Sequence, residues 1–92
     1  MILSFADPDT AQLFKTESNR RFKAIARPAL RKLIQMNRAR VLPDLAVPPG
    51  NRLEPLKGKA TGLYSIRVND QWRVVFRWSA VGPERVSLID YH

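Results

Sequence analysis

The chain has no cysteine and only one histidine, and it contains no long apolar run. Without cysteine there is no disulfide, no cysteine-bound metal and no thiol nucleophile. A single histidine argues against a zinc centre, so we expect neither a metal nor a cofactor. A membrane span needs about 20 apolar residues, and the opening Met1-Ile2-Leu3-Ser4-Phe5 lacks the length and basic leader of a signal peptide. The sequence therefore predicts a cytoplasmic protein that does not bind membranes.

Acidic residues are also scarce. Eight Asp and Glu stand against sixteen Lys and Arg, which gives a net charge of +8. No acidic residue occurs from Ser18 to Pro43, and that stretch holds a run of basic ones: Arg20, Arg21, Lys23, Arg27, Arg31, Lys32, Arg38 and Arg40. Such a run is typical of a surface that binds phosphate or an acidic partner. The plainer alternative is a solvated basic face that only aids solubility.

The first half of the chain predicts helices. Residues 2–5 fit a short strand, after which Asp7 should cap a helix that begins at Pro8 and ends near Thr16. Pro28 should be the first residue of a second helix and hold the residue before it out of that helix. Residues 18–26 fit either a helical turn or a loop.

The second half alternates apolar and polar residues with a period of two, which predicts antiparallel strands. A three-residue loop, Asn69-Asp70-Gln71, joins residues 64–68 to residues 72–78 so that their apolar side chains share one face. The same register puts Arg67 opposite Arg73. Two like charges in this position cost stability unless an anion lies across them.

Helices followed by an antiparallel meander predict one α+β domain over residues 1–92, with the helices on the apolar face of a twisted sheet. Pairing Trp78 with Val86 continues the register into the last strand and brings Tyr91 beside Arg73. The other face of the sheet should then be an open basic floor.

Proton-transfer groups end this last strand. The chain closes on the carboxylate of Asp90, the phenol of Tyr91 and the imidazole of His92. RNA can be cut by its own 2′-hydroxyl, so an RNase needs only a base, an acid and cations that stabilise the phosphate in the transition state. His92 and Asp90 are candidates for proton transfer, and Tyr91 for hydrogen bonding or stacking. The candidate cations are Lys57, Arg67 and Arg73.

Each candidate also has a plainer interpretation. A terminal histidine such as His92 is more often a surface residue than a catalyst. Asp90 fits a structural salt bridge with Arg73. Glu54 is a candidate base, but it fits equally well an ordinary strand-end carboxylate bonded to Arg52 or Lys57.

Three segments carry a family resemblance: Asn51-Arg-Leu-Glu-Pro-Leu-Lys-Gly, residues 62–76, and the closing Asp90-Tyr91-His92. Together they resemble the HigB-type toxins of the RelE/ParE superfamily of bacterial toxin–antitoxin modules. The resemblance extends over nearly the whole chain. It implies a RelE-like microbial RNase fold, in which an N-terminal strand and helices pack on a mostly antiparallel sheet.

The resemblance implies the toxin of a type II toxin–antitoxin system, a ribosome-dependent and metal-independent mRNA endonuclease. Such a toxin enters the A site, cuts the mRNA by 2′-hydroxyl attack and so inhibits translation. The matching catalytic residues are Lys57, Arg73, Asp90, Tyr91 and His92, and Arg67, Glu54 and Lys59 are expected to bind RNA. One position departs from the pattern, because family members can carry histidine where this chain has Glu54.

The implied partners are a HigA-type helix-turn-helix antitoxin and the bacterial ribosome with its mRNA and ribosomal RNA. Operator DNA would be bound only through the antitoxin complex. A ParE-like gyrase inhibitor without RNase activity is the main alternative, and the acid–base tripeptide argues against it. A non-toxic RNA-binding module is a third possibility.

Overall fold

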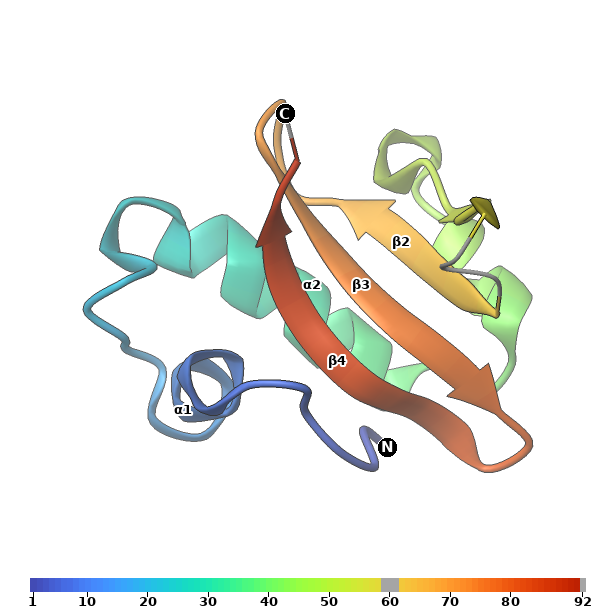
Figure 1. Cartoon of the computed structure of the whole chain (residues 1–92), viewed down its shortest axis with the longest axis horizontal. Helices are drawn as coiled ribbons and strands as arrows, with labels where there is room; N and C mark the ends of the chain where they lie inside the picture. The colour runs from blue at the N-terminus through green and yellow to red at the C-terminus, as the bar shows by residue number, and fades with distance from the viewer. Residues whose placement is uncertain (59–61, 92) are drawn as a thin grey trace.

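The computed structural model describes residues 1–58 and 62–91 and has helices on one face of a four-stranded sheet (Figure 1). The strand order is β1-β2-β3-β4, with every neighbouring pair antiparallel. The predicted α+β class is therefore confirmed. The strands are β1 (Glu54–Pro55), β2 (Leu63–Arg67), β3 (Trp72–Ser79) and β4 (Gly82–Asp90). The helices are α1 (Pro8–Thr16), α2 (Ala26–Arg38) and the short 3₁₀ turns η1 (Lys23–Ile25), η2 (Leu42–Ala46) and η3 (Pro49–Asn51).

α1 begins and ends where the sequence predicts. The Asp7 carboxylate accepts a hydrogen bond from Thr10 N at 2.7 Å, which caps the helix, and Pro8 occupies its first position. Glu17 adopts a left-handed conformation with φ 64° and donates its backbone N–H to Leu13 O. That bond closes the last turn.

α2 begins two residues before the predicted position, so that prediction is wrong. Pro28 lies inside the first turn, and Arg27 before it is helical. The missing N–H of proline costs no helical hydrogen bond there, because the first N–H groups of a helix have no partner within it. The restriction on the preceding residue is only a preference, and the burial of Ile25 and Ala29 outweighs it.

The core fills the space between the helices and the sheet. The β2–β3 register is confirmed, since Tyr64 pairs with Phe76 and Ile66 with Val74. The fully buried side chains include Leu13, Phe22, Leu33, Met36, Leu45, Ile66, Val74, Phe76 and Val86. No helix in the described parts of the chain has the length and apolar character needed to cross a bilayer.

The predicted β3–β4 pairing is wrong. A two-residue turn joins the strands, and Trp78 pairs with Pro83 rather than with Val86. The register then shifts in the middle of β3, where Arg85 on the opposite strand has a left-handed φ of 53°. This geometry is that of a β-bulge, which places one extra residue on β4. Alternation of side chains alone does not reveal a bulge.

The N-terminal strand predicted over residues 2–5 is reduced to one parallel bridge, between Phe5 and Val86. The segment still runs along β4, since Leu3 N donates to Pro83 O at 2.8 Å. The prediction of a continuous strand over these residues is therefore wrong, but the segment lies beside the sheet as expected. It covers part of an otherwise free strand edge.

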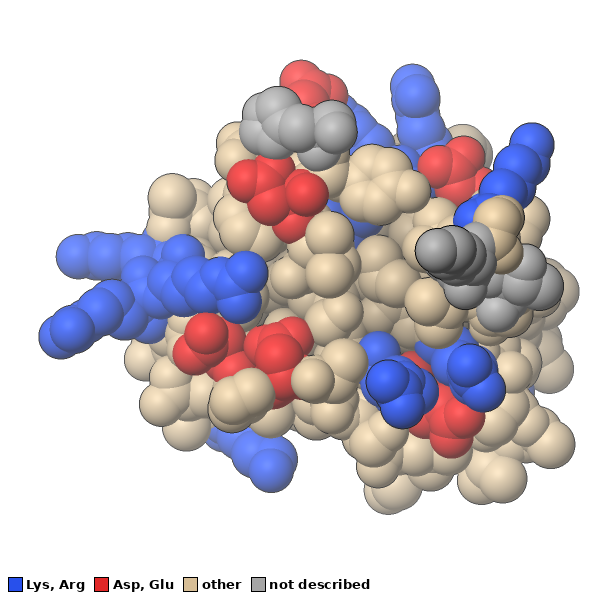
Figure 2. All heavy atoms as spheres, viewed as in Figure 1, with Lys and Arg blue, Asp and Glu red and all other residues tan. Residues whose placement is uncertain are grey.

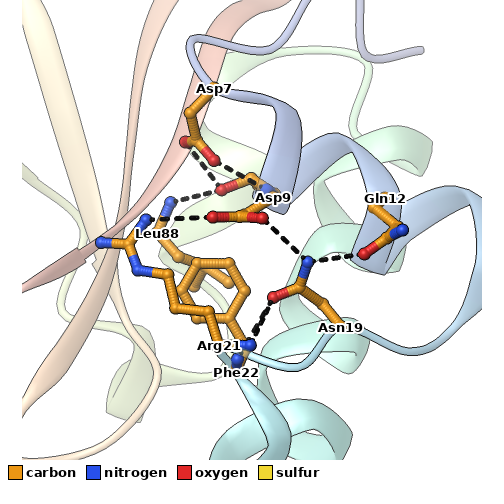
Figure 3. Close-up of polar contacts among 8 residues, drawn as sticks. Asp7, Asp9, Gln12, Asn19, Arg21, Phe22 and Leu88 are labelled. Atoms are coloured by element: carbon orange, nitrogen blue, oxygen red, sulfur yellow. Dashed lines mark hydrogen bonds and ion pairs between the residues drawn. The ribbon is translucent and has the colours of Figure 1, made fainter.

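Polar side chains fasten α1 and the segment after it to β4 (Figure 3). Asn19 is buried, and its amide donates to Asp9 at 3.1 Å and to Gln12 at 2.7 Å. Thr10, fully buried, accepts a hydrogen bond from Leu88 N at 3.1 Å. Thr10 thereby pairs one N–H group of the β4 edge. Asn19 also accepts hydrogen bonds from the backbone N–H groups of Arg21 and Phe22, which fixes the start of the segment that the sequence left undecided.

Asn51 fastens the loop before β1 to α2. The Asn51 side chain is fully buried and donates to Gln35 Oε1 and Leu45 O, each at 3.1 Å. Its oxygen accepts a hydrogen bond from Lys32 Nζ at 2.5 Å. Burial, and then the charge of Arg31, lower the pKa of Lys32 below its ordinary value. The position of the chain just before β1 is thus determined by α2.

Candidate active site on the open face of the sheet

The face of the sheet turned away from α2 carries the predicted site, and we call it the open face (Figure 1). Side chains of both charges lie around its margin, with mostly uncharged atoms in its middle (Figure 2). Ser65, Arg73 and Ser87 on this face are buried. Of the residues expected to make this face a basic floor, Arg67 and Arg73 lie on it, and each forms an ion pair with a carboxylate.

Arg73 lies at the centre of the candidate site. Alternation along β3 turns it away from the core residue Val74, and only 9% of the residue is exposed. Its Nε donates to Ser65 Oγ at 2.8 Å, and its Nη2 donates to Arg52 O at 2.7 Å. The guanidinium is thus held in one direction by neutral acceptors.

One nitrogen of this guanidinium stays open. The hydrogen bonds and ion pair of Arg73 use Nε and Nη2, and none within the described residues uses Nη1. No buried side-chain nitrogen of those residues lacks a hydrogen-bond partner. Nη1 is therefore not completely buried, and it is the guanidinium nitrogen that Ser65 and the Arg52 carbonyl do not use.

Glu54 forms an ion pair with Arg73. Its pairing with Ser65 across β1 and β2 brings its carboxylate to 3.4 Å from Arg73 Nη2. The sequence suggested Arg52 or Lys57 as partners, so that interpretation is wrong. The Glu54 side chain is 55% exposed. It therefore lies at the edge of the candidate site.

Tyr91 covers Arg73 from the end of β4. The Arg73 guanidinium carbon lies 5.8 Å from the centre of the Tyr91 ring, within the range of a cation–π contact. Arg73 pairs with Ile89, two residues before the predicted partner. The predicted pairing is thus wrong, but the predicted proximity of Tyr91 and Arg73 is confirmed.

Arg67 lies directly opposite Arg73, as the register predicts. Its guanidinium forms an ion pair with Asp70, whose side chain is 98% exposed. Each arginine of the like-charge pair therefore has a carboxylate of its own. The cost expected from the two charges is offset within the chain, without a bound anion.

Asp90 does not join this cluster. It pairs with Trp72, so alternation turns it to the opposite side of the sheet from Tyr91. Its carboxylate accepts a hydrogen bond from Gln71 Nε2 at 3.0 Å. The predicted convergence of Asp90 with Arg73 is therefore not found.

The remaining predicted residues lie elsewhere. Lys57 is exposed in the loop after β1, just past Leu56, whose N–H donates to Leu63 O at the start of β2. The length of β2 separates this point from Arg67. Lys59 and His92 lie outside the described residues.

Sequence reasoning missed Ser65 and the Arg52 carbonyl. Ser65 alternates with Arg67 on one face of β2, which was the only available signal. Across residues 1–58 and 62–91, no cluster of three or more carboxylates or histidines has the arrangement of a metal site.

A family model and a related protein of known family both match this chain. Residues 3–92 match a family model described as the RelE-like toxin of type II toxin–antitoxin system HigB. The toxin HigB-1 of Vibrio cholerae serotype O1 is 39% identical over 80 residues, covering 85% of this chain and 84% of that protein.

Two solved structures resemble the fold. The YoeB–YefM complex from Staphylococcus aureus matches with a TM-score of 0.62 at 20% identity, covering 100% of this chain and 98% of that one. The YoeB/ParE toxin from Agrobacterium tumefaciens matches with a TM-score of 0.53 at 21% identity, covering 99% and 96%. At this identity the likeness concerns the fold alone.

Proposed function

The chain belongs to the HigB-like family of RelE-like toxins of type II toxin–antitoxin systems, and from this premise we propose that it is a ribosome-dependent mRNA endonuclease. It enters the ribosomal A site in the cytoplasm and cuts the bound mRNA. Loss of intact message then inhibits translation.

The Arg73 guanidinium is the observation that carries this proposal. It is held by Ser65 Oγ and Arg52 O, and it keeps Nη1 for an anion. A donor that is already oriented stabilises the charge that develops on a phosphate without reorganising. Tyr91, 45% exposed over this guanidinium, offers a ring for stacking and a hydroxyl for hydrogen bonding. Lys57, Arg67 and Lys59 bind the neighbouring phosphates.

The reaction needs only the substrate's own nucleophile. The RNA 2′-oxygen attacks the adjacent phosphorus while a base takes its proton, the bond from phosphorus to the 5′-oxygen breaks, and an acid protonates that oxygen. The products are a 2′,3′-cyclic phosphate and a 5′-hydroxyl. His92 and Glu54 are the candidate proton carriers. Asp90 is the third candidate for proton transfer, although alternation turns it to the other side of the sheet from Tyr91.

The antitoxin in this proposal is a HigA-type helix-turn-helix protein. It neutralises the toxin, and it carries the complex to operator DNA. The toxin itself contacts mRNA and ribosomal RNA, because its own basic residues suit phosphate.

The test is cleavage of a defined mRNA by the purified chain, with and without translating ribosomes. We expect cuts at A-site codons only when ribosomes are present, and fragments ending in a 2′,3′-cyclic phosphate. A variant lacking His92 should cut more slowly, and equal cutting by both proteins would remove His92 from the mechanism. Intact message together with inhibited gyrase supercoiling would instead establish the ParE-like alternative.

A further inference from the structure

The outer side of α2 carries apolar side chains that the core does not use. The side facing the sheet is fully buried and consists of Ala29, Leu33 and Met36. The other side carries residues at i, i+3, i+4 and i+7 that line a groove of about 340 Å³: Arg27, Leu30, Arg31 and Ile34. We call this the α2 groove. Since α2 lies behind β3 and β4 (Figure 1), the sheet separates the groove from the candidate active site.

The middle of the groove is apolar. Ile34 is 37% exposed, and Leu30 one turn before it is half-buried. Isoleucine brings no advantage to an exposed helical position, because its β-branched side chain loses rotamer freedom there. A single apolar side chain on a surface is ordinary, but a pair that lines a hollow is suited to receive another apolar group.

The borders of the groove are basic and have no partner of their own. Arg27 and Arg31 are exposed, and no hydrogen bond or ion pair of either guanidinium group is found in the described parts of the chain. The nearest acidic residues in the sequence lie outside the stretch from Ser18 to Pro43. These guanidinium groups are therefore free to pair with carboxylates of another molecule.

We propose that the α2 groove docks an acidic amphipathic helix of the antitoxin. Apolar side chains of that helix pack between Leu30 and Ile34, and its carboxylates pair with Arg27 and Arg31. This docking surface rests on the proposed function, because the partner is the antitoxin of the same system. The arrangement follows the helix-in-groove mode, in which apolar anchors recur every three or four residues.

The apolar pair argues against RNA as the occupant. A nucleic-acid backbone would satisfy Arg27 and Arg31, but it would leave Leu30 and Ile34 against charged phosphates. An acidic amphipathic helix satisfies both kinds of side chain. The position of the groove behind the sheet lets the partner bind while the open face stays uncovered.

The test compares antitoxin affinity for variants of the full chain, measured by isothermal titration calorimetry at about 0.15 M salt. One variant, Leu30→Ser with Ile34→Ser, removes the apolar centre. Another, Arg27→Glu with Arg31→Glu, reverses the charge of the borders. The matched control is Arg20→Glu with Lys23→Glu, which makes the same change in net charge at exposed residues outside the groove.

We expect each groove variant to weaken antitoxin binding about 30-fold or more, and the control to weaken it less than about threefold. The serine variant should still cut mRNA on ribosomes at the wild-type rate, which verifies its fold and separates docking from catalysis. Unchanged affinity in the groove variants, an equal loss in the control, or no antitoxin binding by the wild type would overturn the docking surface. Loss of ribosome binding with normal antitoxin affinity would assign the groove to RNA.

Discussion

Arg73 combines a structural role with the proposed catalytic one. Its Nε and Nη2 donate to Ser65 Oγ and to the Arg52 carbonyl, and Nη1 is the nitrogen that we propose binds phosphate. The sequence predicted Arg73 and Tyr91, because charged and aromatic side chains at alternating positions are visible in it. It did not predict the acceptors of Arg73, which are the Arg52 carbonyl and Ser65 Oγ. Every residue has a backbone carbonyl, and serine is common in strands, so neither acceptor is marked in the sequence.

Glu54 should compete with RNA for Arg73. Changing Glu54→Gln removes one negative charge 3.4 Å from Nη2 while it keeps the shape of the side chain. Because the Glu54 side chain is 55% exposed, we expect binding to ribosomes that carry a 2′-deoxy A-site codon to tighten only about two- to fivefold. The measurement is equilibrium binding of the variant, with Glu84→Gln as the matched control.

The same variant separates two roles of Glu54. If the carboxylate is the base, cleavage of ordinary mRNA falls although binding tightens. If it only competes with phosphate, cleavage rises with affinity. Weaker binding of Glu54→Gln to the 2′-deoxy codon would contradict the competition.

Elements with local signals were predictable, and those with non-local determinants were not. The cap of α1 lies within four residues, and the β2–β3 hairpin is specified by its own alternation and loop. The β3–β4 register depends on a bulge at Arg85, whose N–H donates to Ser4 Oγ at 2.9 Å. That contact joins residues far apart in the sequence, so no local sequence pattern predicts it.

A substitution at Gly82 tests the contact between the N-terminal segment and β4. It has φ +147°, and a Cβ there would lie 2.8 Å from Met1 O. Gly82→Ala should therefore lower the free energy of unfolding by about 1–3 kcal/mol, as for other residues forced into a strained backbone conformation. Urea denaturation measures this change.

Gly50→Ala is the control, since a Cβ there meets nothing within 4 Å. Its free energy of unfolding should stay within about 0.5 kcal/mol of the wild-type value. Equal stability of the two variants would show that the approach of the N-terminal segment to β4 contributes nothing.

At the scale of the whole molecule, the sheet separates two surfaces of different character. The order of helices and strands was enough to predict the α+β class. The charge bias predicted a basic surface without placing it in the fold, and the basic run from Ser18 to Pro43 lies mainly on η1 and α2. Which face carries which charge depends on how the elements pack, and composition does not contain that information.

The most direct test of Arg73 as the phosphate-binding residue is the rate of mRNA cleavage on ribosomes by Arg73→Lys. Lysine keeps the charge but loses the planar fork, so we predict a fall in kcat of about 100-fold, equal at all codons because a backbone phosphate carries no sequence information. Arg20→Lys makes the same change outside the site and should leave the rate unchanged, and circular dichroism should show both variants folded. A wild-type rate for folded Arg73→Lys, or a loss confined to some codons, would contradict the assignment.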